Sequence, residues 1–208
     1  TDAMEFCRKL SEKTGLKVTL PTEAQWEWAC RGGSASDFWY GDLHADFGKK
    51  DNLADKTTLL FAVAGVDPQP MSPNHPLYKH YTYLPKEESV DDGQLVQVGG
   101  KAYAANPFGL YCMHGNVAEW TSTVYTESGV AAMADLNPEL RYNAAKEDPY
   151  FLKRKSVRGG SWKDPLSYIR SAWRSWEYQN QPRSYIGFRC VRSKAATTSS
   201  VNEKRKKK

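Results

Sequence analysis

The sequence lacks most of the signals that assign a chain to a simple class. No Cys-x-x-Cys spacing is present, so a structural zinc site is not predicted, although four cysteines occur: Cys7, Cys30, Cys112 and Cys190. No apolar run approaches membrane-spanning length. Three scattered histidines, His44, His75 and His80, match neither H-x-H nor H-E-x-x-H. The common zinc-hydrolase pattern is therefore excluded. The chain shows no signal peptide and begins at Thr1 without Met, so we expect a fragment or a processed form.

What the sequence has in abundance is aromatic and turn-forming residues. It contains seven Trp, twelve Tyr, 15 Gly and 11 Pro among 208 residues, with 40% hydrophobic residues overall. This is enough apolar material for one domain with a core, whereas long periodic helices are not expected. We therefore predict a single α+β domain over residues 1–192, irregular and loop-rich, with little regular secondary structure.

The net charge of +5 is concentrated at one end of the chain. Residues 204–208 are all basic and face only Glu203, so the tail carries +4 of the +5. Because residues 195–202 are rich in Ala, Thr and Ser, we predict that residues 193–208 form a disordered basic tail. The body is close to neutral, and we predict no nucleic-acid partner.

Two helices and one closing strand are predicted from local signals. The first helix starts at Thr1 or Asp2 and stops at Gly15, and the second starts at a capping box formed by Thr22 and Gln25 and stops at Gly32-Gly33. A short β-type run is expected at residues 185–191. Residues 46–107 are expected to form a long loop, and the polar residues 121–150 a surface excursion.

The stretch over residues 106–120, Asn-Pro-Phe-Gly-Leu-Tyr-Cys-Met-His-Gly-Asn-Val-Ala-Glu-Trp, combines turn formers, an apolar run and a carboxylate. Its Gly115-Asn116 pair allows the positive φ of a tight loop. Such a loop presents carbonyls and a carboxylate to one point, as calcium sites do. A core turn without a ligand fits the same residues, and both interpretations stay open here.

Four motifs, in order, resemble the formylglycine-generating enzyme or sulfatase-modifying factor domain family. They are LPTEAQWEWACRGG (20–33), FGLYCMHGNVAEW (108–120), RGGSW (158–162) and IGFRC (186–190). The resemblance implies an irregular α+β fold related to C-type lectin-like domains, with structural calcium and a further N-terminal portion absent here. It does not fix an activity, because one fold serves many functions.

The resemblance implies a copper-binding cysteine pair after the Gly-Gly-Ser motif in active oxidases, since thiolates select Cu(I). Residues 159–189 contain no cysteine, and Trp162-Lys-Asp-Pro165 stands where the first would lie. An iron enzyme would need a set of His and carboxylate ligands. Only His114 falls inside a motif, and we interpret it as a loop hydrogen-bonding residue. We therefore expect neither copper nor iron.

The resemblance also implies two calcium sites and one disulfide. The first site would use Asn52, Leu53, Asp92 and Gln94. The second would use Gly115, Val117 and Glu119, but Cys112 replaces the Asp or Asn of the family, which weakens it. The disulfide would join Cys7 to Cys190, with two buried thiols as the alternative. Cys30 and Cys112 are expected to be core residues.

An aromatic and basic cluster follows the Gly-Gly-Ser motif and could bind an anion or a sugar, or simply form the floor of the domain. Its members are Tyr168, Arg170, Trp173, Arg174 and Trp176.

Several features look like the gliding-motility lipoproteins of Bacteroidota, of the GldK/PorK and GldJ kind. They are the long insert between residues 120 and 158, the variant at residues 162–164, and residues 177–179 followed by 184–188. That resemblance implies a non-catalytic, periplasmic, outer-membrane-associated subunit of the type IX secretion machinery. It would be oligomeric, work through protein partners and be lipid-anchored outside this chain. The alternatives are a metal-dependent oxidase and a calcium-dependent carbohydrate-binding module.

Overall fold

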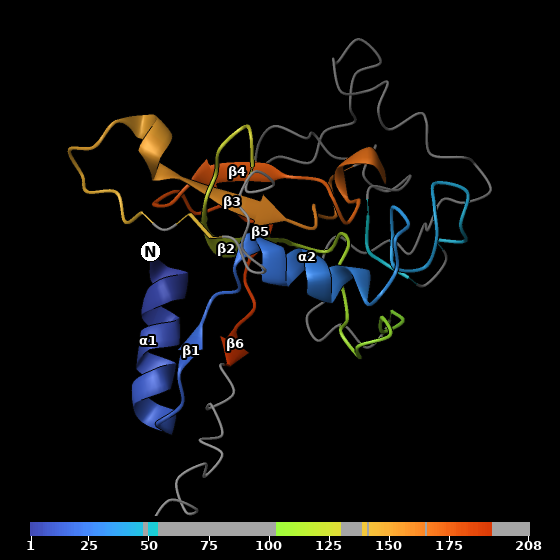
Figure 1. Ribbon diagram of the computed structural model, residues 1–208, viewed down its shortest axis with the longest axis horizontal. Helices are drawn as coiled ribbons and strands as arrows, with labels where there is room; N and C mark the ends of the chain where they lie inside the picture. Colours follow the sequence, from blue (N-terminus) through green and yellow to red (C-terminus); the bar gives the residue numbers. More distant parts are fainter. Residues whose placement is uncertain (48–49, 54–102, 130–138, 141, 165, 193–208) are drawn as a thin grey trace, which may run out of the picture.

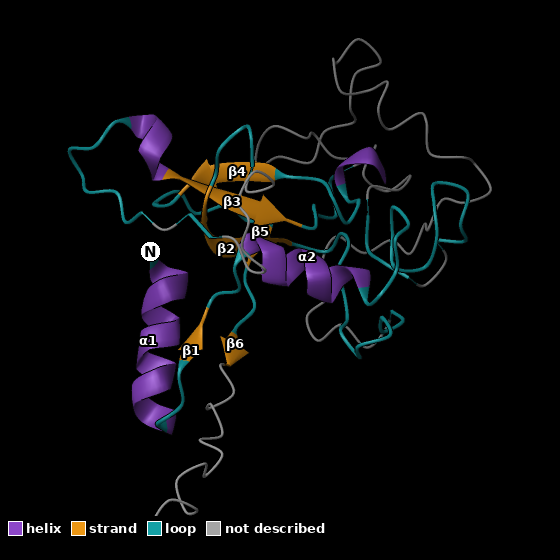
Figure 2. Ribbon diagram, viewed as in Figure 1, coloured by secondary structure: helices purple, strands orange, loops and turns teal. Residues whose placement is uncertain are grey.

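The computed structural model describes residues 1–47, 50–53, 103–129, 139–140, 142–164 and 166–192 (Figure 1). Within these ranges the elements, in chain order, are α1 (Asp2–Thr14), β1 (Val18–Thr19), α2 (Glu23–Arg31), β2 (Ala118–Val124), η2 (Tyr150–Lys153), β3 (Arg154–Arg158), η3 (Leu166–Tyr168), β4 (Ser175–Tyr178), β5 (Ile186–Gly187) and β6 (Val191–Arg192). Loops connect short elements throughout, which confirms the predicted irregular α+β fold (Figure 2).

A four-stranded sheet in the order β4-β3-β2-β5 forms the centre of the domain. Strands β2, β3 and β4 are antiparallel, with Glu119 opposite Arg158 and Ser156 opposite Trp176. The short β5 pairs in parallel with the start of β2. Helix α2 lies against this sheet in Figure 1, and it faces the sheet with the buried side chains of Glu23 and Trp26.

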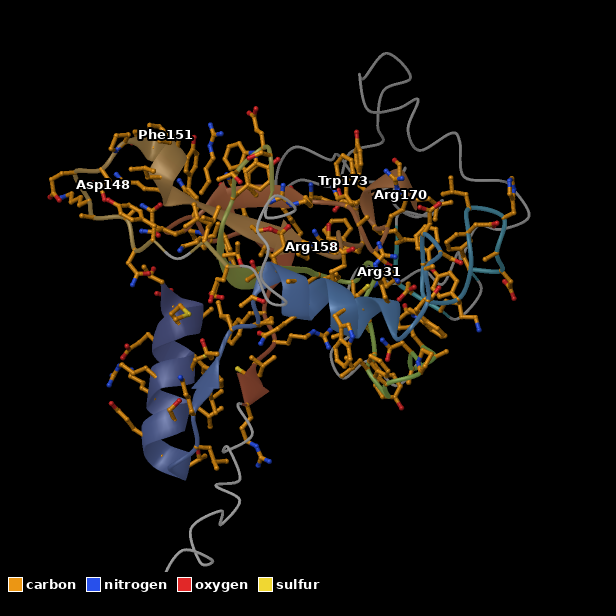
Figure 3. The ribbon with its side chains drawn as sticks, viewed as in Figure 1. Arg31, Asp148, Phe151, Arg158, Arg170 and Trp173 are labelled. Atoms are coloured by element: carbon orange, nitrogen blue, oxygen red, sulfur yellow. The ribbon has the colours of Figure 1, made fainter. Side chains whose placement is uncertain are left out.

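Buried ion pairs join α2 to the sheet. The Arg158 side chain at the end of β3 is fully buried and lies between the sheet and α2 in Figure 3. It donates to Glu23 Oε1 (2.8 Å), to Glu27 Oε2 (2.6 Å) and to the Ser171 carbonyl (2.6 Å). Arg174 donates to both oxygens of Glu23, through Nε to Oε1 at 2.6 Å and through Nη2 to Oε2 at 3.0 Å. Two guanidinium groups thus satisfy one buried carboxylate.

The predicted helix boundaries are confirmed. The Thr22 side chain accepts from Gln25 N while the Gln25 side chain accepts from Thr22 N, so the capping box that begins α2 is present. Gly15 and Gly32 end the two helices in the left-handed conformation, at φ 69° and 55°. These ends are local devices, which is why sequence reasoning finds them.

The prediction that residues 121–150 form a surface excursion is wrong at its start, because residues 121–124 complete β2. Thr121 and Thr123 are buried despite their polarity, since each hydroxyl has a partner: Thr121 donates to the Ser156 carbonyl (3.0 Å), and Thr123 accepts from Glu23 N (3.0 Å). The run at residues 185–191 is also not one strand. It divides into β5, which joins the central sheet, and β6, which pairs with β1.

Helix α1 and the β1-β6 pair lie to one side of the central sheet (Figure 1). The Sγ atoms of Cys7 in α1 and Cys190 beside β6 are 3.5 Å apart. Burial, followed by the neighbouring Cys190 thiol, raises the pKa of Cys7. As two thiols these side chains contact each other, and the same placement suits the disulfide that the family resemblance implies.

We predict that oxidised protein contains a Cys7–Cys190 bridge that raises the free energy of unfolding by about 2–4 kcal/mol, because it closes a long loop. Thiol counting by mass spectrometry under non-reducing conditions should find both cysteines blocked, and reductant should lower the denaturation midpoint. The matched Cys7→Ser/Cys190→Ser variant should not respond to reductant. Alkylation of both thiols in the oxidised, unfolded protein would contradict the bridge.

No helix in the described parts of the chain is both long and apolar enough to cross a membrane.

Candidate binding site

A pocket of about 260 Å³ opens beside the Gly-Gly-Ser motif, between the central sheet and the segment that follows β3. It is lined by Ala118, Val157, Gly160, Lys163, Asp164, Tyr168, Trp173, Ser175, Trp176, Glu177, Tyr185 and Ile186. According to the family resemblance, the first copper-binding cysteine of the oxidases would lie in the segment after β3, at residues 162–165. The residues that line the pocket instead supply aromatic rings, one ammonium group and two carboxyl groups.

Aromatic side chains form much of the wall. Tyr168 and Trp173 pack with ring centroids 4.6 Å apart and an interplanar angle of 31°. The Arg154 guanidinium lies 4.2 Å from the Trp176 ring, and the Lys163 ammonium lies 3.9 Å from the Tyr185 ring. Stacked rings with cations over their faces give a rigid, amphipathic wall that suits a flat or apolar group.

The two carboxylates of the pocket are engaged by the protein itself. Asp164 accepts from Ser161 N (2.8 Å) and Ser161 Oγ (2.7 Å). Glu177 accepts from Tyr178 N (2.8 Å) and from Arg183 Nε (2.6 Å). These bonds hold the two carboxyl groups in fixed positions at the pocket.

Gly160 sets the shape of the pocket rim. Its φ is +64°, and a Cβ at this position would lie 2.7 Å from the Tyr168 carbonyl oxygen and 2.6 Å from Ile169 Cγ2. Only glycine lets the backbone at position 160 come this close to Tyr168 and Ile169.

The structure divides the predicted aromatic and basic cluster. Tyr168, Trp173 and Trp176 line the pocket, whereas Arg170 and Arg174 do not. Arg170 contacts the Asp37 carboxylate at 3.7 Å, and Figure 3 shows it on the same side of the sheet as Trp173. Arg174 is bound to Glu23. Sequence reasoning did not name five further pocket residues as site residues, although all but Ser175 lie in segments that it singled out: Lys163, Asp164, Ser175, Glu177 and Tyr185.

The 106–120 loop packs around a buried polar centre. His114 is fully buried, and its Nδ1 lies 2.6 Å from the Ile169 carbonyl oxygen. Its Nε2 accepts from Trp39 N (3.4 Å) and lies 3.5 Å from Cys30 Sγ. Burial lowers the pKa of His114 to about 4 and raises the pKa of Cys30 to about 12. Both groups are neutral at pH 7, so this pair is neither a thiolate nucleophile nor its base.

Asp51 is the buried carboxyl that sequence reasoning missed. It is fully buried among the aromatic residues around Phe38 and Tyr40, and burial raises its pKa well above the usual value. Burial thus favours the uncharged form of this carboxyl group.

The predicted calcium residues fall into described and undescribed parts. Asn52 is buried and its carbonyl accepts from Asn116 N at 2.5 Å, so the Asn52-Leu53 segment is tied to the 106–120 loop. Asp92 and Gln94 lie outside the described residues. The Glu119 carboxylate accepts hydrogen bonds from Arg189 Nε and Trp26 Nε1. Cys112, beside it, is a neutral thiol whose pKa burial raises to about 11. No group of three or more His, Cys, Asp or Glu side chains in the described ranges is arranged to hold a metal.

These features define a loop-rich α+β domain with an aromatic pocket beside a Gly-Gly-Ser turn. The chain belongs to the sulfatase-modifying factor enzyme 1-like domain family, which it matches over residues 1–194. It is 32% identical over 181 residues to the formylglycine-generating enzyme of Mycobacterium tuberculosis, covering 83% of this chain and 50% of that protein. It is 27% identical over 207 residues to the formylglycine-generating enzyme of Bos taurus, covering 95% of this chain and 43% of that protein. The chain thus spans about half the length of these relatives.

Among solved structures, PvdO from Pseudomonas aeruginosa resembles the fold with a TM-score of 0.62 at 22% identity, over 92% of this chain and 58% of that one. At this identity the likeness concerns the fold alone.

Proposed function

We propose that this chain is a non-catalytic member of its family that serves as a protein-contact domain. The observation that carries the proposal is the composition of the pocket. Where the oxidases of the family are expected to place thiolates, this pocket has Lys163 and Asp164, and residues 159–189 contain no cysteine. The pocket carboxylates are engaged within the protein, so the pocket keeps its shape without the thiolates that would hold copper.

The setting we propose is a periplasmic, outer-membrane-associated assembly of the type IX secretion and gliding-motility kind. Support comes from the sequence, in the insert between residues 120 and 158 and in the segments at 162–164, 177–179 and 184–188. In this proposal the chain is part of an oligomeric protein complex, meets the membrane only through a lipid anchor outside the chain, and contacts no nucleic acid.

Exposed aromatic residues support a role in protein contact. Tyr150 and Phe151 on η2 are 71% and 60% exposed, and Trp28 on α2 is 68% exposed. Large aromatic side chains are enriched at protein interfaces because they bury much area at low conformational cost. The pocket, which none of these three residues lines, is a second candidate contact point.

The pocket is tested with Trp173→Ala in the full-length protein purified from its own envelope. If the pocket holds a partner's side chain, the amount of at least one co-purifying protein should fall about 30-fold, as loss of an interface hot spot predicts. Phe6→Ala is the control, since it removes an exposed aromatic ring that does not line the pocket and packs on Phe188 instead (centroids 5.4 Å apart). An unchanged set of partners for Trp173→Ala, with an unchanged melting temperature, would contradict the pocket as a contact site.

The enzyme alternative is a metal-dependent oxidase, and it has support from relatives that are named formylglycine-generating enzymes. It is tested by metal analysis of the full-length protein together with oxygen consumption in the presence of thiol peptides. Stoichiometric copper or iron with turnover would overturn the non-catalytic proposal. Absence of turnover with a correctly folded protein would support it.

The carbohydrate alternative has one favourable observation, the stacked Tyr168 and Trp173 at the pocket. Aromatic faces pack well against sugar rings. Calcium-dependent glycan binding that is lost in Trp173→Ala would favour this function over protein contact. Binding that also depends on Asp92 would point to the first predicted calcium site.

A further inference from the structure

The Arg189 guanidinium lies against the 106–120 loop and is surrounded by oxygen atoms of that loop. Its Nε donates to Glu119 Oε2 (2.5 Å) and its Nη2 donates to Glu119 Oε1 (2.6 Å). The same Nη2 also contacts the carbonyl oxygens of Tyr111 (3.1 Å) and Cys112 (3.3 Å). One cation thus gathers a carboxylate and two loop carbonyls.

Both oxygens of Glu119 already accept from protein donors. Oε2 accepts from Trp26 Nε1 (2.7 Å) and Arg189 Nε, and Oε1 accepts from Arg189 Nη2, so three of the roughly four lone-pair positions of the carboxylate are taken. The Glu119 side chain is only 8% exposed. A charge-assisted, bidentate pair of this kind is strong and fixes the orientation of both groups.

The residues present fit this guanidinium better than the calcium ion that the family resemblance implies at Gly115, Val117 and Glu119. Calcium takes about 6–8 oxygen ligands, preferably with carboxylates among them. Here Cys112 offers a soft sulfur in place of an oxygen ligand, and the carboxylate that remains is paired with Arg189. A divalent ion placed against Glu119 would also meet the positive charge of Arg189.

Cys112 itself has φ 51°, a left-handed conformation that Asn and Asp adopt more readily than other residues with a side chain. An oxygen-bearing Asn could therefore replace Cys112 without backbone strain. The loop backbone therefore has a conformation that suits the Asn or Asp of the family at position 112, although the side chain here is that of cysteine.

We infer that Arg189 acts as a built-in cation that holds the 106–120 loop closed in place of calcium, so that this loop is independent of the ion. The inference does not depend on the proposed function, since it concerns how the fold is held. It predicts that calcium adds no stability to this loop while Cys112 and Arg189 are in place.

The first test measures calcium dependence on the full-length protein with Asp92→Ala, which disables the other predicted calcium site. Melting temperatures in excess calcium and in EDTA should agree within about 1 °C, because a ligand that does not bind the folded state cannot stabilise it. Terbium should give no emission sensitised by Trp26, which lies next to Glu119. A calcium-dependent rise of several degrees, or sensitised terbium emission that Glu119→Gln abolishes, would overturn the inference.

The second test removes the built-in cation. Arg189→Met should lower the melting temperature by roughly 10 °C, since it leaves a buried carboxylate without its counter-charge. The control is Arg8→Met, which removes an exposed guanidinium that also contacts two carboxylates and should change the melting temperature little. An Arg189→Met protein as stable as the starting protein would contradict the inference.

The third test exchanges the two cations. Cys112→Asn/Arg189→Met should regain stability in calcium by several degrees, and magnesium should not substitute, because its smaller and stricter coordination shell does not fit. No response to calcium in the folded double variant would contradict the idea that the guanidinium occupies the position of the ion. If Arg189→Met does not fold, the first test decides by itself, as it needs no change at Arg189.

Discussion

Replacing Glu23 by glutamine is expected to lower the free energy of unfolding by about 3–5 kcal/mol, because it leaves a buried guanidinium without its counter-charge. Arg158 is fully buried and donates to Glu23 at 2.8 Å, while Arg174 donates to both oxygens of the same carboxylate. Glutamine keeps the size and one acceptor oxygen but removes the negative charge between the two cations. Urea denaturation followed by circular dichroism measures the change.

The control for this substitution is Glu5→Gln, which removes an exposed carboxylate that contacts Arg8 and Lys9 on α1. Its denaturation midpoint should stay close to that of the starting protein, because exposed ion pairs contribute little. Equal midpoints for Glu23→Gln and Glu5→Gln would show that the buried network contributes no more than a surface pair.

The same network gives stability a dependence on acid. Burial by itself raises the pKa of Glu23, but the hydrogen bond from Arg174 and the charges of Arg158 and Arg174 together outweigh it, so the pKa is lowered. A carboxyl group whose folded pKa is lowered contributes stability above its unfolded pKa and loses it as the pH falls through the folded pKa. Unfolding free energy should therefore fall below about pH 5, and less steeply in Glu23→Gln. An equally steep or steeper loss in the variant would contradict this assignment.

Gly115→Ala is expected to cost about 2–5 kcal/mol, combining left-handed strain with overpacking. Gly115 has φ +70°, and an added Cβ would lie 2.0 Å from the Asn52 carbonyl oxygen, which is backbone and cannot turn aside. That carbonyl accepts from Asn116 N, so the link between the two segments would be lost as well. Chemical denaturation and amide exchange at Asn116 measure the two effects.

Gly109→Ala separates the two contributions, because Gly109 lies in the same loop with φ +77° but has open space around its Cβ position. It should cost only about 1–2 kcal/mol, the price of the left-handed conformation alone. If both alanine variants lost the same stability, close approach to Asn52 would not be the reason for glycine at position 115.

Local features of this fold were accessible from the sequence because they act over a few residues. The capping box of Thr22 and Gln25 and the glycines that end α1 and α2 depend only on neighbours in the chain. The membership of the family followed from four ordered motifs in the same way. The extent of β2 did not follow, because Thr121 and Thr123 reveal their burial only through partners elsewhere in the fold.

The candidate site was only partly accessible. Tyr168, Trp173 and Trp176 were expected together and do line one pocket, but the arginines between them face other segments. Periodicity could not separate them, since the segment bends through η3 before β4 and does not present a single face.

The sequence by itself determined the family, the α+β class, the helix ends and the glycines that the tight turns require, because these depend on local backbone chemistry. Only the tertiary structure determined which charged side chains form ion pairs. Glu23 and Arg158 are 135 positions apart, and Glu119 and Arg189 are 70 apart. Such pairs exist only after distant segments pack, since a buried charge takes whichever partner the fold brings within hydrogen-bond distance.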